Sequence, residues 1–367
     1  MKTLYQSSIE VILAGQAESG AYVASPTFSQ YRACWMRDGA LIAYSMDCAG
    51  QHASATRFFQ WANRTLQRHQ ARIDHVLDLF ERHQPLTDSD YLPTRFTLDG
   101  ELVPGKWGDF QLDGYGTWLW ALGAHIEQTG DTAFYTECRT SVEYVCRYLS
   151  ALWQQPNYDC WEENPEQIHM ATLAAVYGGL MAVHRLDPTL NTEPIAAKIC
   201  EYVLHNGINR IVGTADQHFV KYIGNPAVDS SLLWLAVPYS LVTVDDPLFT
   251  QTLTAIERDL HHTDSGVYRY RADVYYGGGE WLLLTAWLGW VYAVKGEPDK
   301  ARKLLRWIQA QTDTDGLLPE QTSEHLLAPE HFESWVALWG NVAKPLLWSH
   351  AMVLILYHAL QLKDDSQ

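Results

Sequence analysis

The chain has 367 residues, of which 47% are hydrophobic and 19% charged, so it can bury a large core and is not globally disordered. Its net charge of −17, from 43 acidic and 26 basic residues, argues against a nucleic-acid partner or an anionic membrane surface and suits a neutral substrate. No stretch approaches the roughly 20 apolar residues of a spanning helix, and residues 1–15 do not form a signal sequence, so we expect a cytoplasmic protein.

Twelve stretches carry the apolar periodicity of α-helices. We expect helices near residues 2–14, 38–49, 52–69, 112–128, 131–153, 165–185, 190–206, 229–241, 246–260, 280–295, 298–311 and 345–362. Asn164-Pro165, followed by Gln167, has the form of a capped helix start. Strand signals are few, and Gly213–Tyr222 and Gly266–Tyr276 are the candidates for short hairpins.

The even-numbered stretches are the more apolar, as in Ala351–Tyr357, whereas the odd-numbered ones are amphipathic, as in Pro298–Arg306. A helix that is apolar all round is buried, and an amphipathic helix faces water on one side. An inner ring of six helices wrapped by an outer ring of six satisfies this pattern. We therefore expect an all-α (α/α)6 barrel, with residues 1–367 forming a single domain.

Polar and aromatic residues gather at the starts of the apolar stretches. The clusters are Trp35–Asp38, Trp107–Gly114, Trp161–Glu163, Tyr275–Trp281 and Glu320–Trp348. In an alternating ring the inner helices all start at the same end. These segments, far apart in the sequence, should therefore converge on one pocket.

Two adjacent carboxylates, Glu162 and Glu163, follow Trp161 and precede a predicted helix. An apolar neighbour and a second carboxylate both raise the pKa of a carboxylic acid, which can then hold a proton near neutral pH and donate it to a glycosidic oxygen. An acidic first turn that complements the helix dipole is the plainer interpretation, and the residues alone leave both open.

Glu320 lies behind Pro319 in a long loop and is a candidate second carboxylate. Inverting glycoside hydrolysis needs a base about 6.5–9.5 Å from the acid, which leaves room for the attacking water. Glu324, Glu330 and Glu333 lie in the same loop and compete for this role. Spacing alone does not choose among the four.

Other clusters suit a sugar ligand. Asp38 can accept hydrogen bonds from a pair of hydroxyls while Arg37 fixes its geometry, although an N-cap role is as good an interpretation. The run Gly277–Gly279 lacks the lysine of a phosphate loop and is expected to permit a tight turn or a close backbone approach. His350, alone on an apolar helix, is expected to be a core residue without a role.

No other catalytic or metal-binding pattern competes. The chain lacks a Gly-x-Ser-x-Gly elbow and a His-Glu-x-x-His motif. Its six cysteines show no Cys-x-x-Cys spacing, so we expect buried, reduced thiols and no metal site.

In their order along the chain, these motifs resemble glycoside hydrolase family 15, the glucoamylase and glucodextranase family. The matching segments are Trp35–Asp38, Trp107–Gly114, Trp161–Glu163, Arg269 before Tyr275–Gly278, Pro319–Gln321 and Leu347–Ser349. The resemblance implies that Glu162 is the catalytic acid and Glu320 the catalytic base. It also implies that the substrate is held by Trp35, Arg37, Asp38, Trp107, Gln111, Trp161, Glu163, Arg269 and Trp348.

The family resemblance further implies inversion, with release of β-glucose and no cofactor. Asp109 stands where fungal relatives have an arginine, in a region that shapes the second sugar subsite. We therefore expect short α-1,4- or α-1,6-linked gluco-oligosaccharides, cut from the non-reducing end, as substrates and as the partner of this chain. A trehalose-type α,α-1,1-glucoside hydrolase, a non-catalytic carbohydrate-sensing module of the same fold, and an (α/α)6 epimerase or phosphorylase are the alternatives.

Overall fold

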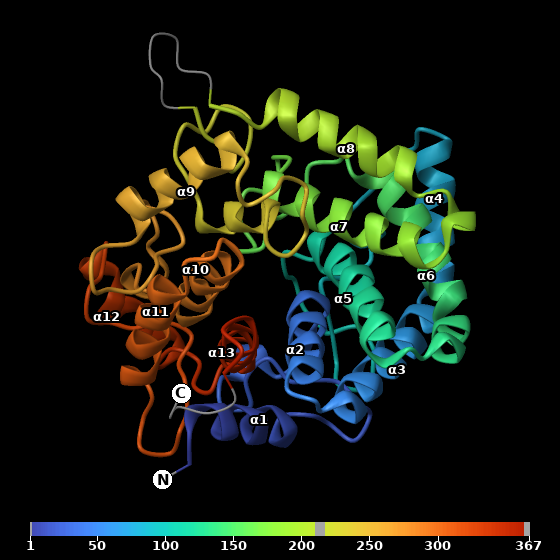
Figure 1. The fold of residues 1–367 in the computed structure, drawn as a ribbon. Helices are drawn as coiled ribbons and strands as arrows, with labels where there is room; N and C mark the ends of the chain where they lie inside the picture. The colour runs from blue at the N-terminus through green and yellow to red at the C-terminus, as the bar shows by residue number, and fades with distance from the viewer. Residues whose placement is uncertain (1, 210–216, 363–367) are drawn as a thin grey trace.

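The helices of the chain form two concentric rings (Figure 1). The computed structural model describes residues 2–209 and 217–362. Its longer helices are α1 (Leu4–Ala14), α2 (Met36–Cys48), α3 (His52–Arg68), α4 (Gln70–Glu81), α5 (Asp113–Thr129), α6 (Thr132–Leu152), α7 (Met170–Leu186), α8 (Glu193–Asn206), α9 (Pro247–Leu260), α10 (Leu282–Val294), α11 (Pro298–Ala310), α12 (Phe332–Trp339) and α13 (Leu347–Ala359). A short 3-10 helix, η3 (Ser230–Leu235), lies between α8 and α9 in the chain.

The inner ring runs α2, α5, α7, η3, α10 and α13. Each element packs against the next, and α13 closes the ring on α2. The outer elements α1, α3, α6, α8, α9 and α11 pack against α13, α2, α5, α7, η3 and α10 respectively (Figure 1). The expected all-α (α/α)6 barrel is therefore confirmed.

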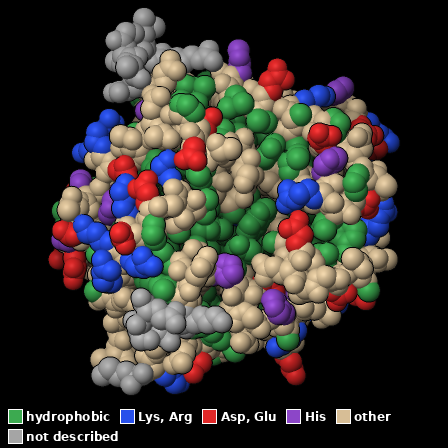
Figure 2. Space-filling model, in the orientation of Figure 1, with side chains coloured by type: hydrophobic (Ala, Val, Ile, Leu, Met, Phe, Trp, Pro, Cys, Tyr) green, Lys and Arg blue, Asp and Glu red, His purple; other side chains and the backbone are tan. Residues whose placement is uncertain are grey.

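Burial follows the alternation that the sequence predicts. Every residue of α10 from Leu282 to Tyr292 is buried, so this helix is enclosed on all sides. In α11 the buried residues Ala301, Leu304, Leu305 and Ile308 recur every three or four positions and form one stripe. Charged side chains accordingly lie around the margin of the face in Figure 2, and hydrophobic side chains gather at its centre.

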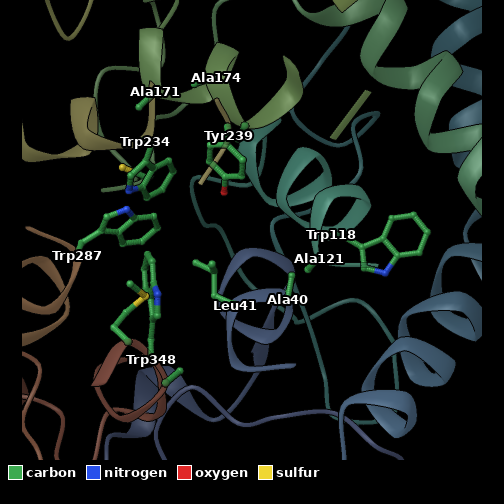
Figure 3. Packing of buried hydrophobic residues seen from close by; sticks show 14 of the residues in the cluster. Ala40, Leu41, Trp118, Ala121, Ala171, Ala174, Trp234, Tyr239, Trp287 and Trp348 are labelled. Atoms are coloured by element: carbon green, nitrogen blue, oxygen red, sulfur yellow. The ribbon is translucent and has the colours of Figure 1, made fainter. Parts of the chain in front are cut away.

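Aromatic side chains fill the middle of the barrel (Figure 3). Trp234 of η3 stacks on Trp287 of α10 with ring centroids 4.9 Å apart, and Trp287 meets Trp348 of α13 edge-on at 6.4 Å. The Trp287 indole donates a hydrogen bond to the Val237 carbonyl at 2.8 Å, so its buried N–H is satisfied. The inner ring therefore encloses a packed core.

Two predicted helix boundaries are wrong. Helix α7 begins at Met170 and not at Pro165. The segment before it is held in turns by its own backbone bonds, such as Gln167 N–H to the Asn164 carbonyl, and Met170 N–H bonds to the Lys221 carbonyl. The predicted helix at 229–241 is instead the 3-10 helix η3, which ends before Pro238. Proline lacks the backbone N–H and disfavours helical geometry in the residue before it, so the helix cannot continue.

Two helices were not predicted, α4 and α12, and strands are shorter than expected. Within the described residues the one sheet pairs β1 (Cys34–Trp35) with β2 (Arg95–Phe96). The Gly266–Tyr276 hairpin is replaced by isolated bridges such as Val267 to Trp281. The Gly213–Tyr222 hairpin falls partly outside the described residues, since residues 210–216 are not described.

Two further features concern the chain as a whole. Across residues 2–209 and 217–362, no helix combines the length and the apolar character needed to cross a membrane. All six cysteines are free thiols; Cys34, Cys138, Cys146 and Cys160 are buried, which agrees with the sequence expectation, whereas Cys48 and Cys200 are half-buried.

Candidate active site

Loops that precede the inner helices meet in a cavity of about 220 Å³ at one end of the barrel. Ten of the eleven residues singled out in the sequence line it: Trp35, Arg37, Asp38, Trp107, Trp161, Glu162, Glu163, Arg269, Glu320 and Trp348. The eleventh, Gln111, is buried behind the wall and bonds to two of the lining residues. The volume is below the roughly 300–1,000 Å³ of clefts for drug-sized ligands and suits a small one.

A turn organised by Asp159 presents the two adjacent glutamates. One Asp159 carboxylate oxygen accepts the backbone N–H groups of Trp161 at 3.0 Å and Glu163 at 2.8 Å. Glu162, between them, has φ of +66°, in the left-handed region that side chains other than glycine seldom adopt. Such strain persists only where surrounding contacts enforce it, which here they do.

Glu162 is partly buried and is held by two N–H donors. The Trp35 indole donates to Glu162 Oε1 at 2.7 Å, and the Gln111 amide donates to the same atom at 3.3 Å. Burial raises the pKa of Glu162, while the nearby Arg37 charge and the two hydrogen bonds oppose the rise. The net shift is upward, so Glu162 holds its proton more tightly than an exposed glutamate does.

Glu320 enters the cavity from the loop between α11 and α13 and is 3% exposed. The Tyr31 hydroxyl donates to Glu320 Oε1 at 3.0 Å, and Tyr31 in turn contacts the Tyr275 hydroxyl at 2.9 Å. Burial raises the pKa of Glu320 to about 8, and its buried Oε2 has no hydrogen-bond partner among residues 2–209 and 217–362. An orphaned acceptor facing a cavity is suited to a ligand or a water.

The competing glutamates of the same loop lie elsewhere. Glu324, Glu330 and Glu333 are all exposed and do not line the cavity. Backbone bonds hold Glu320 in place, with its N–H bonded to the Ala343 carbonyl and its carbonyl accepting from Leu282. The geometry therefore selects Glu320 among the four as the carboxylate that can reach a bound ligand.

Arg37 and Asp38 form the floor of the cavity at the start of α2. The Arg37 guanidinium donates to Gln111 and to the buried Asp113, both at 2.9 Å, and lies 5.3 Å from the Trp348 ring centroid. Asp38 Oδ2 is 3.6 Å from Arg37 Nε, beyond hydrogen-bond distance, and this buried oxygen has no hydrogen-bond partner in the described part of the chain. Burial raises the pKa of Asp38 to about 7. Both groups retain unused hydrogen-bonding capacity.

Glu163 and Arg269 meet on another side of the cavity. Arg269 makes a two-pronged ion pair with Asp273 and lies 3.5 Å from Glu163 Oε1, while the Tyr270 hydroxyl donates to Glu163 Oε2 at 2.6 Å. Burial raises the pKa of Glu163, and Arg269 opposes that rise. Both side chains point into the cavity with their geometry fixed by neighbours.

Beneath them lies a buried lysine that the sequence did not single out. Lys221 Nζ pairs with Asp159 at 2.6 Å and with Asp229 at 3.2 Å, and it lies 3.9 Å from Glu163. Asp229 also accepts the Trp161 indole N–H at 3.1 Å. Lys221 therefore joins the loops that precede α7 and η3.

Tryptophans wall the cavity, and the buried Arg95 lies behind two of them. The Arg95 guanidinium lies 3.7 Å from the centroid of Trp107 and 5.1 Å from that of Trp35, a cation–π arrangement that fixes both rings. Trp161 packs against Trp281 at 5.7 Å. Arg95 stands outside the recognised motifs, so nothing in the sequence alone marked it.

Further lining residues were missed from the sequence. Tyr31 lies outside the predicted clusters, whereas Tyr275, Trp281 and Trp339 lie within Tyr275–Trp281 and Glu320–Trp348 but are not among the predicted site residues. Dense aromatic residues beside carboxylates are the signal that could have identified these three. Tyr31 reaches the cavity through tertiary packing alone.

Paired carboxyl groups in a tryptophan-walled pocket, at one end of a double ring of helices, define a glycoside hydrolase. Comparison with family models agrees: residues 1–358 match the model of glycosyl hydrolases family 15. The chain belongs to this family.

Individual relatives are consistent with that membership. An isomaltose glucohydrolase of Kribbella flavida is 43% identical over 366 residues, covering 98% of this chain and 93% of that protein. A glycosidase variant solved in complex with glucose has 42% identity and a TM-score of 0.92, covering 98% of this chain and 96% of that one. Trehalase 2 of Sulfolobus acidocaldarius is 25% identical over 328 residues, covering 82% of this chain and 55% of that protein.

Proposed function

We propose that this chain is an inverting, exo-acting α-glucoside hydrolase that releases β-glucose from the non-reducing end of short gluco-oligosaccharides, with isomaltose as the first substrate to test. The observation that carries the proposal is the presence of two carboxyl groups, Glu162 and Glu320, in one small cavity. The 43% identity to an isomaltose glucohydrolase over 98% of the chain supports the choice of substrate.

The terminal glucose occupies the floor of the cavity. Asp38 accepts hydrogen bonds from the glucose hydroxyls with its Oδ2 atom, and Arg37 Nε donates one. Neither atom has a hydrogen-bond partner among the described residues. Glu163, from the loop before α7, and Arg269, from the loop before α10, hold further hydroxyls. Trp35, Trp107, Trp161 and Trp348 cover the apolar faces of the sugar ring, and Gln111 keeps Arg37 and Glu162 in place.

The bond is broken in one displacement. Protonated Glu162 donates its proton to the glycosidic oxygen as the bond to the anomeric carbon breaks. Glu320 takes a proton from a water molecule, whose oxygen attacks the anomeric carbon from the opposite face, so the configuration inverts. The product is β-glucose, and the shortened sugar leaves with the proton from Glu162. No cofactor enters the balance of atoms.

The order of the two roles rests on the sequence motifs, and the pKa shifts favour the opposite order. Burial raises the pKa of Glu320 to about 8, which keeps a proton on it at neutral pH. Burial also raises the pKa of Glu162, but the N–H donors of Trp35 and Gln111 stabilise its charged form and oppose that rise. Activity on α-D-glucosyl fluoride, a substrate that needs no acid, separates the two orders.

Trehalose is a second candidate substrate, because trehalase 2 of Sulfolobus acidocaldarius aligns with 82% of this chain. Its 25% identity is well below the 43% of the isomaltose glucohydrolase, so the α-1,6 linkage is tested first. A sugar-sensing module would bind sugar without needing both carboxyl groups, and a phosphorylase would require inorganic phosphate.

Proton NMR of the reaction tests the proposal. The purified protein is mixed with isomaltose, maltose, isomaltotriose and trehalose, beside Glu162→Gln and Glu320→Gln controls. We expect early β-glucose from isomaltose, with the α anomer appearing only by mutarotation, and loss of activity in both controls. Early α-glucose would refute inversion, and binding without turnover would support the sensing module.

A further inference from the structure

One short helix at the cavity carries an exposed apolar surface. Helix α12 lies in the loop between Glu320 and α13. Its Leu338 is 70% exposed and its Trp339 is 40% exposed. Among the described residues that line the cavity, Trp339 is the one exposed side chain, since the others are buried or half-buried. Trp339 therefore lies where the cavity opens to solvent.

A row of aromatic rings connects this opening with the interior. Trp339 packs near Trp335 at 6.3 Å with an interplanar angle of 30°, and Trp335 stacks on Tyr276 at 5.7 Å and 26°. Trp335 also meets Tyr275 at 5.0 Å, and the Tyr275 hydroxyl contacts Tyr31, the donor to Glu320. The exposed ring is thus supported from behind and oriented relative to the reacting end of the pocket.

Backbone contacts fix the helix to the barrel. The Tyr276 hydroxyl donates to the carbonyl of Gly340, the residue that follows α12, at 3.1 Å. Before the helix in the chain, the backbone N–H groups of Leu327 and Ala328 donate to the carbonyls of Gly278 and Gly277 respectively. A side chain at Gly279 would lie 1.9 Å from the Thr322 carbonyl oxygen, so glycine is required for this close approach. The glycine run noted in the sequence therefore holds the α12 segment in place.

We propose that Trp339 forms the binding surface for the sugar unit beyond the scissile bond, the one that leaves. This inference rests on the proposed function, because it supposes that the buried end of the cavity holds the terminal glucose. Arg37, Asp38 and Arg269 are all buried, so the glucose that they hold lies deepest. In exo cleavage the remaining sugar must then extend toward the opening, where Trp339 lies.

The chemistry of the exposed ring matches that sugar. One face of a pyranose ring is lined by C–H groups, which pack against the flat indole, and a tryptophan loses little conformational freedom in doing so. Exposed apolar surface beside a pocket typically marks a ligand-binding groove. A single supported ring offers a platform for one sugar, which agrees with a preference for disaccharides over long chains.

The test compares two substrates that share the terminal glucose and differ in the leaving group. Isomaltose has a leaving sugar, whereas α-D-glucosyl fluoride has none. We measure kcat/KM for both with the wild type, Trp339→Ala, Trp339→Phe and Leu338→Ala. Leu338 is the matched control, because it is on the same helix and more exposed but does not line the cavity.

For Trp339→Ala, we expect the ratio of kcat/KM on isomaltose to that on the fluoride to fall about tenfold, the size of one lost aromatic contact. Trp339→Phe should keep most of the ratio, and Leu338→Ala should keep all of it. An unchanged ratio in Trp339→Ala, whether both activities fall together or neither does, would overturn the inference. A wild-type protein that cleaves neither substrate would instead refute the proposed function.

Discussion

Replacing Lys221 by methionine should destabilise the protein and distort the acidic turn. Methionine has a similar length, so the change removes the charge and leaves little cavity. At an effective dielectric constant of about 20, the ion pairs at 2.6 Å to Asp159 and 3.2 Å to Asp229 are each worth about 5–6 kcal/mol of attraction. Much of this attraction only offsets the free-energy cost of removing the three charged groups from water. Losing one member of a buried pair costs about 3–5 kcal/mol, because its partner is left charged and buried.

The free energy of unfolding in urea measures this effect, and kcat/KM measured beside it reports on the turn. We expect a loss of about 3–5 kcal/mol. The matched control is Lys2→Met, which breaks the exposed pair with Glu10 and should cost less than about 1 kcal/mol. A loss below about 1 kcal/mol in Lys221→Met, no larger than in the control, would refute the reasoning that Lys221 neutralises the carboxylates under the turn.

Two other predictions concern stability. The raised pKa of Glu320, about 8 against 4.5, means that the folded protein holds this proton more tightly than the unfolded chain does, so ionising Glu320 costs stability progressively between about pH 5 and pH 8. The Tm of Glu320→Gln relative to the wild type should therefore rise across that window, and a constant difference would contradict the shift. His350→Leu removes the acceptor of the buried Leu318 N–H and the partner of Ser8. It should lower the free energy of unfolding in urea by about 1–3 kcal/mol, whereas His358→Leu, at an exposed position, should change it little. Equal effects would contradict a role for His350 in holding the Glu320 loop.

His350 also shows where sequence reasoning stopped short. An isolated histidine on an apolar helix predicts a buried core residue, and it is one, with burial lowering its pKa to about 3. Its Nε2 accepts the Leu318 N–H at 3.1 Å, two residues before Glu320. No pattern in the sequence reports a hydrogen bond between positions 32 residues apart.

The fold was predictable because it depends on periodicity. The local sequence determines whether a helix is apolar all round or along one stripe. This difference distinguishes the helices of the inner ring from those of the outer ring. The prediction of a helix at 229–241 was wrong because Pro238 interrupts a stretch whose apolar pattern continues past it. The predicted start of α7 was wrong because the turn organised by Asp159 and the tertiary bond from Met170 N–H to the Lys221 carbonyl outweigh the local capping signal at Asn164.

Site residues that belong to a sequence motif could be predicted, whereas those that reach the site only through packing could not. Motif residues such as Glu162 and Glu320 could be placed from the sequence because they precede inner helices. Lys221, Arg95 and Tyr31 lie in loops without a recognisable pattern, and they act through residues far away in the chain. Their contributions follow from burial and distance, which a single sequence does not contain.

Two substrates test which carboxyl group is the acid: kcat/KM of Glu162→Gln and of Glu320→Gln is measured on isomaltose and on α-D-glucosyl fluoride. Fluoride leaves without a proton, so a general acid is dispensable for that substrate, whereas the base is needed for both. We predict that Glu162→Gln loses about 10²–10⁴-fold on isomaltose and keeps most of its activity on the fluoride, and that Glu320→Gln loses both. The reverse result, with Glu320→Gln active on the fluoride and Glu162→Gln inactive on both, would make Glu320 the acid and contradict the account.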